Sequence, residues 1–169
     1  MEKEINKMKR ILFLDIDGVL AGYEYLCLQR KEPFTFIDPE KCGLLNQLNG
    51  AEIVISSSWG YDEGRTEETL KACGLELPII GYTKKVHYQF EWACRGNEIE
   101  EWIQRTYGGI GTCFGSEYDS KDYDYVIFDD DQDMLLGQVG HFIHVDRMTG
   151  LTQADIDKAK KILNYDNCN

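Results

Sequence analysis

Two aspartates separated by one residue follow a short apolar segment near the start of the chain. Residues 11–14 (Ile-Leu-Phe-Leu) lead into Asp15 and Asp17, and Gly18 comes directly after them. An apolar segment bounded by charge predicts a buried strand of a parallel sheet, and open α/β sheets bind ligands beyond the carboxyl ends of their strands. Alternation along the strand turns both carboxylates to the same side. Because two uncompensated carboxylates in one place are costly, the pair predicts a bound cation.

Two further strands are predicted to end in oxygen-bearing side chains. One apolar segment leads into Asp129 and Asp130, and residues 51–55 lead into serines at 56–58. Hard oxygen ligands suit Mg²⁺, which is bound by a few carboxylates together with water and substrate phosphate. We therefore predict that the second pair of acids and Asp15 converge on one divalent-ion site.

Four motifs of the chain resemble those of the haloacid dehalogenase (HAD) superfamily of phosphoryl-transfer enzymes. Residues 15–19 (Asp-Ile-Asp-Gly-Val) are similar to its first motif, and Ser56 after an apolar strand is similar to the second. Arg95, ahead of a predicted helix, best matches the third, where the family more often has lysine. Residues 129–130, with Asp133 nearby, match the fourth.

Three longer segments narrow this resemblance. Residues 53–59, 95–102 and 126–131 resemble the HAD domains of bacterial and phage Swiss-army-knife RNA-repair proteins. The similarity extends from about residue 9 to about residue 163. It implies an α/β fold, namely a Rossmann-like three-layer α/β/α sandwich with a central, mostly parallel sheet and a minimal cap.

The resemblance also implies roles for the two aspartates of the first motif. Asp15 is expected to attack phosphorus, which splits hydrolysis into two steps through an aspartyl-phosphate. Asp17 is expected to protonate the leaving oxygen and then to activate water, while its backbone carbonyl contacts the metal. A carboxyl group beside a nucleophilic carboxylate is pushed toward its protonated form, as the acid role requires.

Serine hydroxyls and one cation are expected to hold the phosphate. Ser56 or Ser57 fills the second-motif role, because the register of the strand end is open. Arg95 would neutralise phosphate at the start of a helix, where the helix dipole also favours anions. Lys84 and Lys85 are its rivals for this role.

The predicted cofactor is Mg²⁺, held by acids of the first and fourth motifs. Asp131 and Asp133 either support the metal ligands or cap the turn that follows them. His141 and His144 are three positions apart, which places them on opposite faces of a predicted strand and argues against a shared metal. The implied Mg²⁺ ligands are Asp15, Asp17, Asp129 and Asp130.

The amino-acid composition limits the classes of protein to which the chain can belong. The chain has 169 residues, of which 43% are hydrophobic and 28% charged, as expected for a single globular domain with a sizeable core. The net charge of −12 argues against a broad, nonspecific grip on long nucleic acid. The six cysteines form no Cys-x-x-Cys pair, so a zinc knuckle is not expected. Without a signal-peptide core or a membrane-length apolar run, the expected location is the reducing cytoplasm.

The remaining elements are predicted to alternate, as in a doubly wound sheet. A helix is expected to start at residues 38–39, where Asp38 caps it and Pro39 takes its first position. Another is expected to end at Gly74. The predicted ranges are a helix at 66–73, a short strand at 77–81, a helix at 97–107, an exposed loop at 108–124, a strand at 141–145 and a helix from about 152 to 163.

The gaps between motifs are too short for a full cap domain, so one domain over residues 1–169, with an N-terminal extension at 1–9, is expected. Only residues 18–37 and 81–94 could shade the entrance, and both contain aromatic side chains. An open site would admit the end of a polymer or a phosphoprotein, and the resemblance suggests a nucleotide or a nucleic-acid terminal phosphate as the substrate. Trp59 could either stack a base or pack in the fold. The alternatives are a phosphatase of small nucleotides or other phosphomonoesters, and a non-catalytic binding module with this fold. No membrane association is expected, and the sequence identifies no protein partner.

Overall fold

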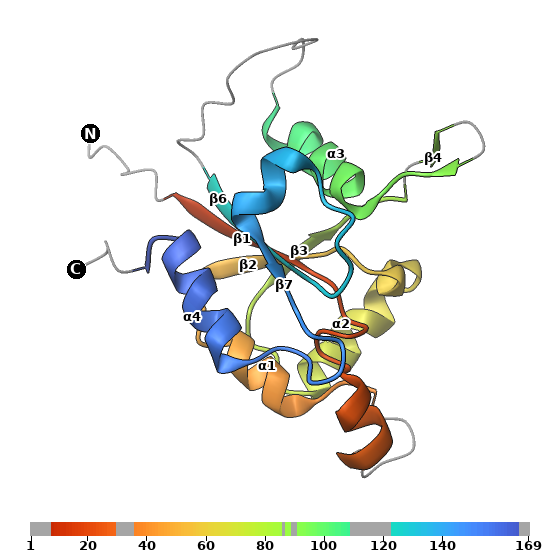
Figure 1. Cartoon of the computed structure of the whole chain (residues 1–169), viewed down its shortest axis with the longest axis vertical. Helices are drawn as coiled ribbons and strands as arrows, with labels where there is room; N and C mark the ends of the chain where they lie inside the picture. Colours follow the sequence, from red (N-terminus) through yellow and green to blue (C-terminus); the bar gives the residue numbers. More distant parts are fainter. Residues whose placement is uncertain (1–7, 30–35, 86, 89–90, 109–122, 166–169) are drawn as a thin grey trace.

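The structure is a computed structural model that describes residues 8–29, 36–85, 87–88, 91–108 and 123–165. Its centre is a five-stranded sheet in the order β3-β2-β1-β6-β7, and every neighbouring pair of strands is parallel (Figure 1). The strands are β1 (Lys9–Leu14), β2 (Ala51–Ile55), β3 (Ile79–Tyr82), β6 (Tyr123–Asp129) and β7 (Phe142–His144).

Helices cover both faces of the sheet, which gives the predicted three layers. On one face lie α1 (Pro39–Leu45), α2 (Glu63–Ala72) and α4 (Gln153–Ile162), and on the other lies α3 (Arg95–Tyr107) (Figure 1). Alternation along β1 divides its side chains between two cores: Leu12 and Leu14 pack toward α1, α2 and α4, whereas Phe13 packs toward α3. A strand that is apolar on both faces is what a central position in such a sheet requires. The fold is therefore Rossmann-like α/β.

The residues predicted to start α1 and to end α2 occupy these positions in the structure. Asp38 accepts a hydrogen bond from the Glu40 N–H, and Pro39 is the first residue of α1. Gly74 follows α2 with φ of 88°. The α2 helix nevertheless begins at Glu63, three residues before the predicted start, because Asp62 caps it by accepting from the Arg65 N–H. The predicted start at residue 66 was wrong for this reason.

Other boundaries differ by one or two residues. The third strand is β3, shifted toward the carboxyl end relative to the predicted 77–81, and α3 begins at Arg95 instead of residue 97. The last strand lies inside the predicted 141–145, and the final helix opens with a capping box between Thr152 and Asp155. Most of the predicted loop at 108–124 lies outside the described residues.

The described residues of the two predicted entrance segments form short elements. The first contains the short helical segment η1 (Tyr25–Gln29), and the second contains the antiparallel pair β4 (His87–Tyr88) and β5 (Glu91–Trp92). Residues 30–35, 86 and 89–90 of these segments, like residues 1–7 of the N-terminal extension, are outside the described part.

The described part contains four cysteines, Cys27, Cys42, Cys73 and Cys94, and all four are free thiols. Burial beside Cys73 raises the pKa of Cys42 to about 12, so this thiol behaves as a core side chain. None of the helices in the described ranges combines the length and the apolarity that a bilayer crossing requires.

Candidate active site

Strand register brings the predicted motifs together. Leu14 of β1 is paired with Ile55 of β2 on one side and with Phe128 of β6 on the other. The next residue of each strand, Asp15, Ser56 and Asp129, therefore emerges at the same edge of the sheet. Two backbone hydrogen bonds continue the ladder, from Ser56 N–H to the Leu14 carbonyl (2.9 Å) and from Asp15 N–H to the Phe128 carbonyl (3.0 Å).

Three carboxylates meet at this edge. One oxygen from each of Asp15, Asp129 and Asp130 lies within 4.8 Å of the other two. Asp15 and Asp129 are only 5% and 1% exposed. Burial, and secondly the charge of Asp129, raise the pKa of Asp15 to about 7, and burial raises that of Asp129 to about 6. Clustered, buried oxygen donors of this kind fit a hard divalent cation such as Mg²⁺.

Arg95, the first residue of α3, contacts two of the clustered carboxylates. Its guanidinium lies 3.5 Å from Asp15 Oδ1, 3.2 Å from Asp129 Oδ2 and 3.2 Å from Glu98 Oε2. Burial lowers the pKa of Arg95, but the surrounding carboxylates outweigh it and the net shift is upward. Asp133 accepts the Arg95 backbone N–H (2.8 Å) and so caps the helix that carries this side chain.

The two rival lysines lie elsewhere. Lys85 pairs with Glu98, at 3.4 Å between Nζ and Oε1, and so reaches the site only through that carboxylate. Lys84 is exposed and lines a different cavity of about 640 Å³. Glu98 is 2% exposed and forms ion pairs with both Arg95 and Lys85. The sequence did not indicate this role, because a glutamate in the first turn of a helix usually faces solvent.

The two candidate serines have different surroundings. Ser56 is fully buried, and its hydroxyl oxygen has no hydrogen-bond partner among the described residues. Ser57 Oγ accepts the Trp59 backbone N–H (3.5 Å), and its hydroxyl bonds to Asp15 and lowers the pKa of that carboxyl. A buried unpaired hydroxyl is costly. A phosphoryl oxygen that accepts the Ser56 hydroxyl would remove that cost.

Asp17 stands apart from the three clustered carboxylates. Its side chain is exposed, and both of its oxygens accept the indole N–H of Trp59 at 3.1 Å. Trp59 is itself held in place, because the Thr66 hydroxyl donates to its carbonyl (2.8 Å). Sequence reasoning placed Trp59 beside the serines but did not foresee this contact.

Gly18 makes room for Asp130. Its φ is 76°, and a Cβ built there would lie 2.4 Å from Asp130 Cγ. The Asp130 carboxylate pairs with Arg147 (3.1 Å), which also pairs with Asp131 (3.0 Å). Burial raises the pKa of Asp130, while Arg147 opposes that shift. Arg147 follows β7 and carried no motif, so the sequence offered no signal for it.

The two histidines lie in different places. His144 donates through Nε2 to the Asp130 carbonyl (2.9 Å), at the carboxylate end of β6. His141 donates through Nδ1 to the Tyr125 carbonyl (2.8 Å) and stacks on the Tyr125 ring, 4.1 Å between centroids.

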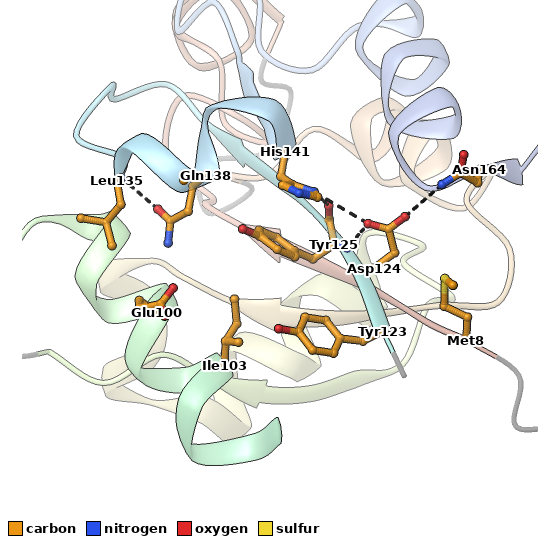
Figure 2. Close-up of a pocket in the computed structure, with 11 residues that line it drawn as sticks. Met8, Glu100, Ile103, Tyr123, Asp124, Tyr125, Leu135, Gln138, His141 and Asn164 are labelled. Carbon is orange, nitrogen blue, oxygen red and sulfur yellow. Dashed lines mark hydrogen bonds and ion pairs between the residues drawn. The ribbon is translucent and has the colours of Figure 1, made fainter. Parts of the chain in front are cut away.

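A separate cavity of about 530 Å³ lies beside the first residues of β6, between α3 and the segment η3 (Leu136–His141) (Figure 2). Its acidic side chains already have partners: Asp124 accepts from Asn164, and Glu100 accepts from Gln104. The predicted site residues Asp15, Asp129 and Asp130 do not line it, because they lie at the opposite end of the strands.

Comparison with known proteins agrees with this geometry. Residues 11–156 match the family model described as the HAD domain in Swiss Army Knife RNA repair proteins. Searches of curated proteins and of solved structures gave no match. The matched range spans β1 through the first turn of α4 and includes every strand end described above. The chain thus belongs to the family of HAD domains of Swiss Army Knife RNA-repair proteins, and this membership supports a hydrolase.

Proposed function

We propose that this protein is a Mg²⁺-dependent phosphohydrolase that acts through an aspartyl-phosphate. The observation that carries the proposal is the meeting of Asp15, Asp129 and Asp130 within 4.8 Å, with Arg95 in contact with two of them. Oxygen ligands on three sides, a buried cation and the unpaired Ser56 hydroxyl form a receptor for a phosphoryl group.

The first chemical step belongs to Asp15. Its carboxylate oxygen forms a bond to phosphorus while the bond between phosphorus and the leaving oxygen breaks, and Asp17 transfers a proton to that oxygen. In the second step water attacks the phosphorus of the acyl phosphate. Asp17 takes the proton from the water, and Asp15 is regenerated as inorganic phosphate leaves.

The ionisation state of Asp15 is central to this scheme. Burial holds its pKa at about 7, so the carboxylate needs positive charge nearby to attack as an anion at neutral pH. Arg95 supplies one such charge at 3.5 Å. A divalent cation held by Asp15, Asp129 and Asp130 would supply the other and would neutralise charge on the phosphoryl oxygens.

A nucleotide or a nucleic-acid terminal phosphate is the substrate class we propose. Family membership supports it, since the matched family is described from RNA-repair proteins. The segments between motifs also support it, because η1 and the β4–β5 pair are short and would leave the site open to a polymer end.

The test is a screen of phosphomonoesters with Mg²⁺, with Asp15→Asn as the blank. We expect release of inorganic phosphate by the wild type and none above background by the variant, whose fold should be intact because the amide has the same shape. Equal turnover by both proteins would refute the nucleophile assignment. Phosphate-ester binding without turnover by the wild type would favour a non-catalytic module instead.

A further inference from the structure

An aromatic cavity lies directly beside the proposed active site. Phe36, Trp59 and Tyr61 line a space of about 380 Å³ together with polar side chains from the start of α2, among them Asp62 and Arg65. We call this space the aromatic groove. Tyr61 is 85% exposed and Phe36 is 44% exposed, which is unusual for side chains of this size.

The aromatic groove is connected through Trp59 to Asp17, the proposed general acid. Trp59 lines the groove, and its indole N–H is bonded to both oxygens of Asp17. In the proposed mechanism Asp17 protonates the oxygen that leaves phosphorus. The body of the leaving alcohol must therefore extend from Asp17, and the aromatic groove is the cavity lined by the tryptophan that Asp17 contacts.

The groove is preorganised. Its central segment, η2 (Ser58–Tyr61), is held by the Thr66 hydroxyl on the Trp59 carbonyl and by the Gly60 N–H on the Ser57 carbonyl (3.2 Å). The Asp62 side chain is engaged in capping α2, at 3.2 Å from the Arg65 N–H. A wall that is already ordered loses little conformational entropy when a ligand binds.

The side chains of the groove select for a flat ring and an anion. Aromatic side chains stack nucleobases of any sequence, because every base presents a π-face. Arg65 lines the groove and brings a positive charge to it, although the chain as a whole carries a net charge of −12. A guanidinium in the lining complements the negative charge of a nucleotide.

We infer that the aromatic groove holds the nucleobase of the leaving nucleoside, an assignment that rests on the proposed phosphohydrolase function. The substrate is then a phosphomonoester whose alcohol carries a base, either a free nucleotide or the end of an oligonucleotide. Tyr61 and Phe36 contact the base, and Arg65 faces the sugar–phosphate. Ribose phosphate has the same reacting group but nothing to fill the groove.

The test compares adenosine 5′-phosphate, a 5′-phosphorylated oligoadenylate and ribose 5-phosphate, and repeats the first two with the phosphate on the 3′ oxygen. We expect kcat/KM to be at least about tenfold higher with a base than without one, the lower range of what one stacked base provides. Tyr61→Ala should reduce that ratio by about the same factor, mainly through KM, and Tyr61→Phe should restore it because the ring remains.

Leu136→Ala is the matched control, since Leu136 is a 92% exposed apolar residue on η3, away from the groove. It should keep the wild-type ratio. The comparison of kcat/KM between the free nucleotide and the oligonucleotide shows which of the two is the preferred substrate. A ratio near one, or a ratio that Tyr61→Ala does not lower, would overturn the inference. If no phosphomonoester is hydrolysed at all, the proposed function itself has failed.

Discussion

Trp59 donates one indole N–H to both carboxylate oxygens of Asp17, at 3.1 Å to each. The bond joins the end of β1 to the segment after β2, across 42 residues of sequence. Asp17 is exposed and does not belong to the carboxylate cluster, so this contact fixes where the proposed acid–base group points. A tryptophan thus contacts the proposed acid, and an arginine contacts the proposed nucleophile.

Trp59→Phe should lower kcat about tenfold and change the KM for ribose 5-phosphate by less than about threefold. The phenyl ring keeps the packing but has no donor for Asp17, so the acid samples orientations that cannot reach the leaving oxygen, and general acid–base catalysis contributes about 10²–10⁴-fold. Steady-state kinetics with circular dichroism as a check of folding would measure it. A normal kcat would show that the bond has no catalytic role.

Gly18→Ala should weaken Mg²⁺ binding and destabilise the protein, because a Cβ there would lie 2.4 Å from Asp130 Cγ. The matched control is Gly50→Ala. Gly50 has φ of 80°, close to the 76° of Gly18, but its added Cβ would meet no atom within 4 Å. Both variants should lose about 1–2 kcal/mol from left-handed backbone strain.

Only Gly18→Ala should also lose metal affinity, by more than about tenfold as Asp130 is displaced. Chemical denaturation would give the stabilities and calorimetric titration the affinities. Equal Mg²⁺ affinities for the two alanine variants would mean that Asp130 is not a ligand.

Mg²⁺ affinity should rise steeply with pH and level off above about pH 7. The pKa values of Asp15 and Asp129, about 7 and about 6, lie above the ordinary value of 3.8, and the cation needs both groups ionised. Below both pKa values each pH unit should change the affinity by up to about 100-fold, because two protons must leave. Titration calorimetry between pH 5.5 and 8.5 would test this, and a flat profile would contradict it.

Without metal, the same two groups should make the protein less stable as pH rises. The folded state binds more protons than the unfolded state between about pH 4 and pH 7, so their contribution to stability is present below this window and is lost through it. Asp129→Asn removes one carboxylate and the repulsion on Asp15. The melting temperature of this variant, relative to that of the wild type, should therefore increase as pH rises. If the difference between the two melting temperatures stays constant with pH, the raised pKa values are contradicted.

Arg147→Gln should raise Mg²⁺ affinity about threefold to fivefold. Arg147 is paired with Asp130, one of the proposed metal ligands, and an ion pair of such exposure stabilises by up to about 1 kcal/mol. Lys158→Gln is the control, because Lys158 forms a 3.1 Å pair with Asp155 on α4 and its side chain is 61% exposed, against 62% for Arg147. Weaker Mg²⁺ binding by Arg147→Gln would show that the arginine holds Asp130 in place.

The sequence was sufficient for the sheet and for the strand-end acids because both depend on local patterns. Apolar segments followed by Asp15 and Asp129 predict buried parallel strands, and the parallel register then brings their ends together. The start of α2 was missed because Asp62, within a polar stretch, caps the helix in a way that the pattern of apolar residues does not indicate.

The partners of the acids were harder to predict. Trp59 and Arg147 reach the site through contacts between residues distant in sequence. Glu98 contacts Arg95 from one turn further along α3, where a glutamate carries no motif of its own. The choice of Arg95 over the two lysines likewise depends on the path of the chain between β3 and α3, which local propensity does not fix.

The position of β1 between β2 and β6 has a consequence for folding. The three strand ends come from positions 15, 56 and 129, and the pairing of Leu12 with Val126 closes a loop of more than one hundred residues. Contacts so distant in sequence form late, because the entropy of closing the chain opposes them. Until β6 docks, Asp15 and Asp129 remain hydrated and far apart. The appearance of Mg²⁺ affinity during refolding should therefore mark the final long-range step of assembly, which makes the metal a reporter of completed folding.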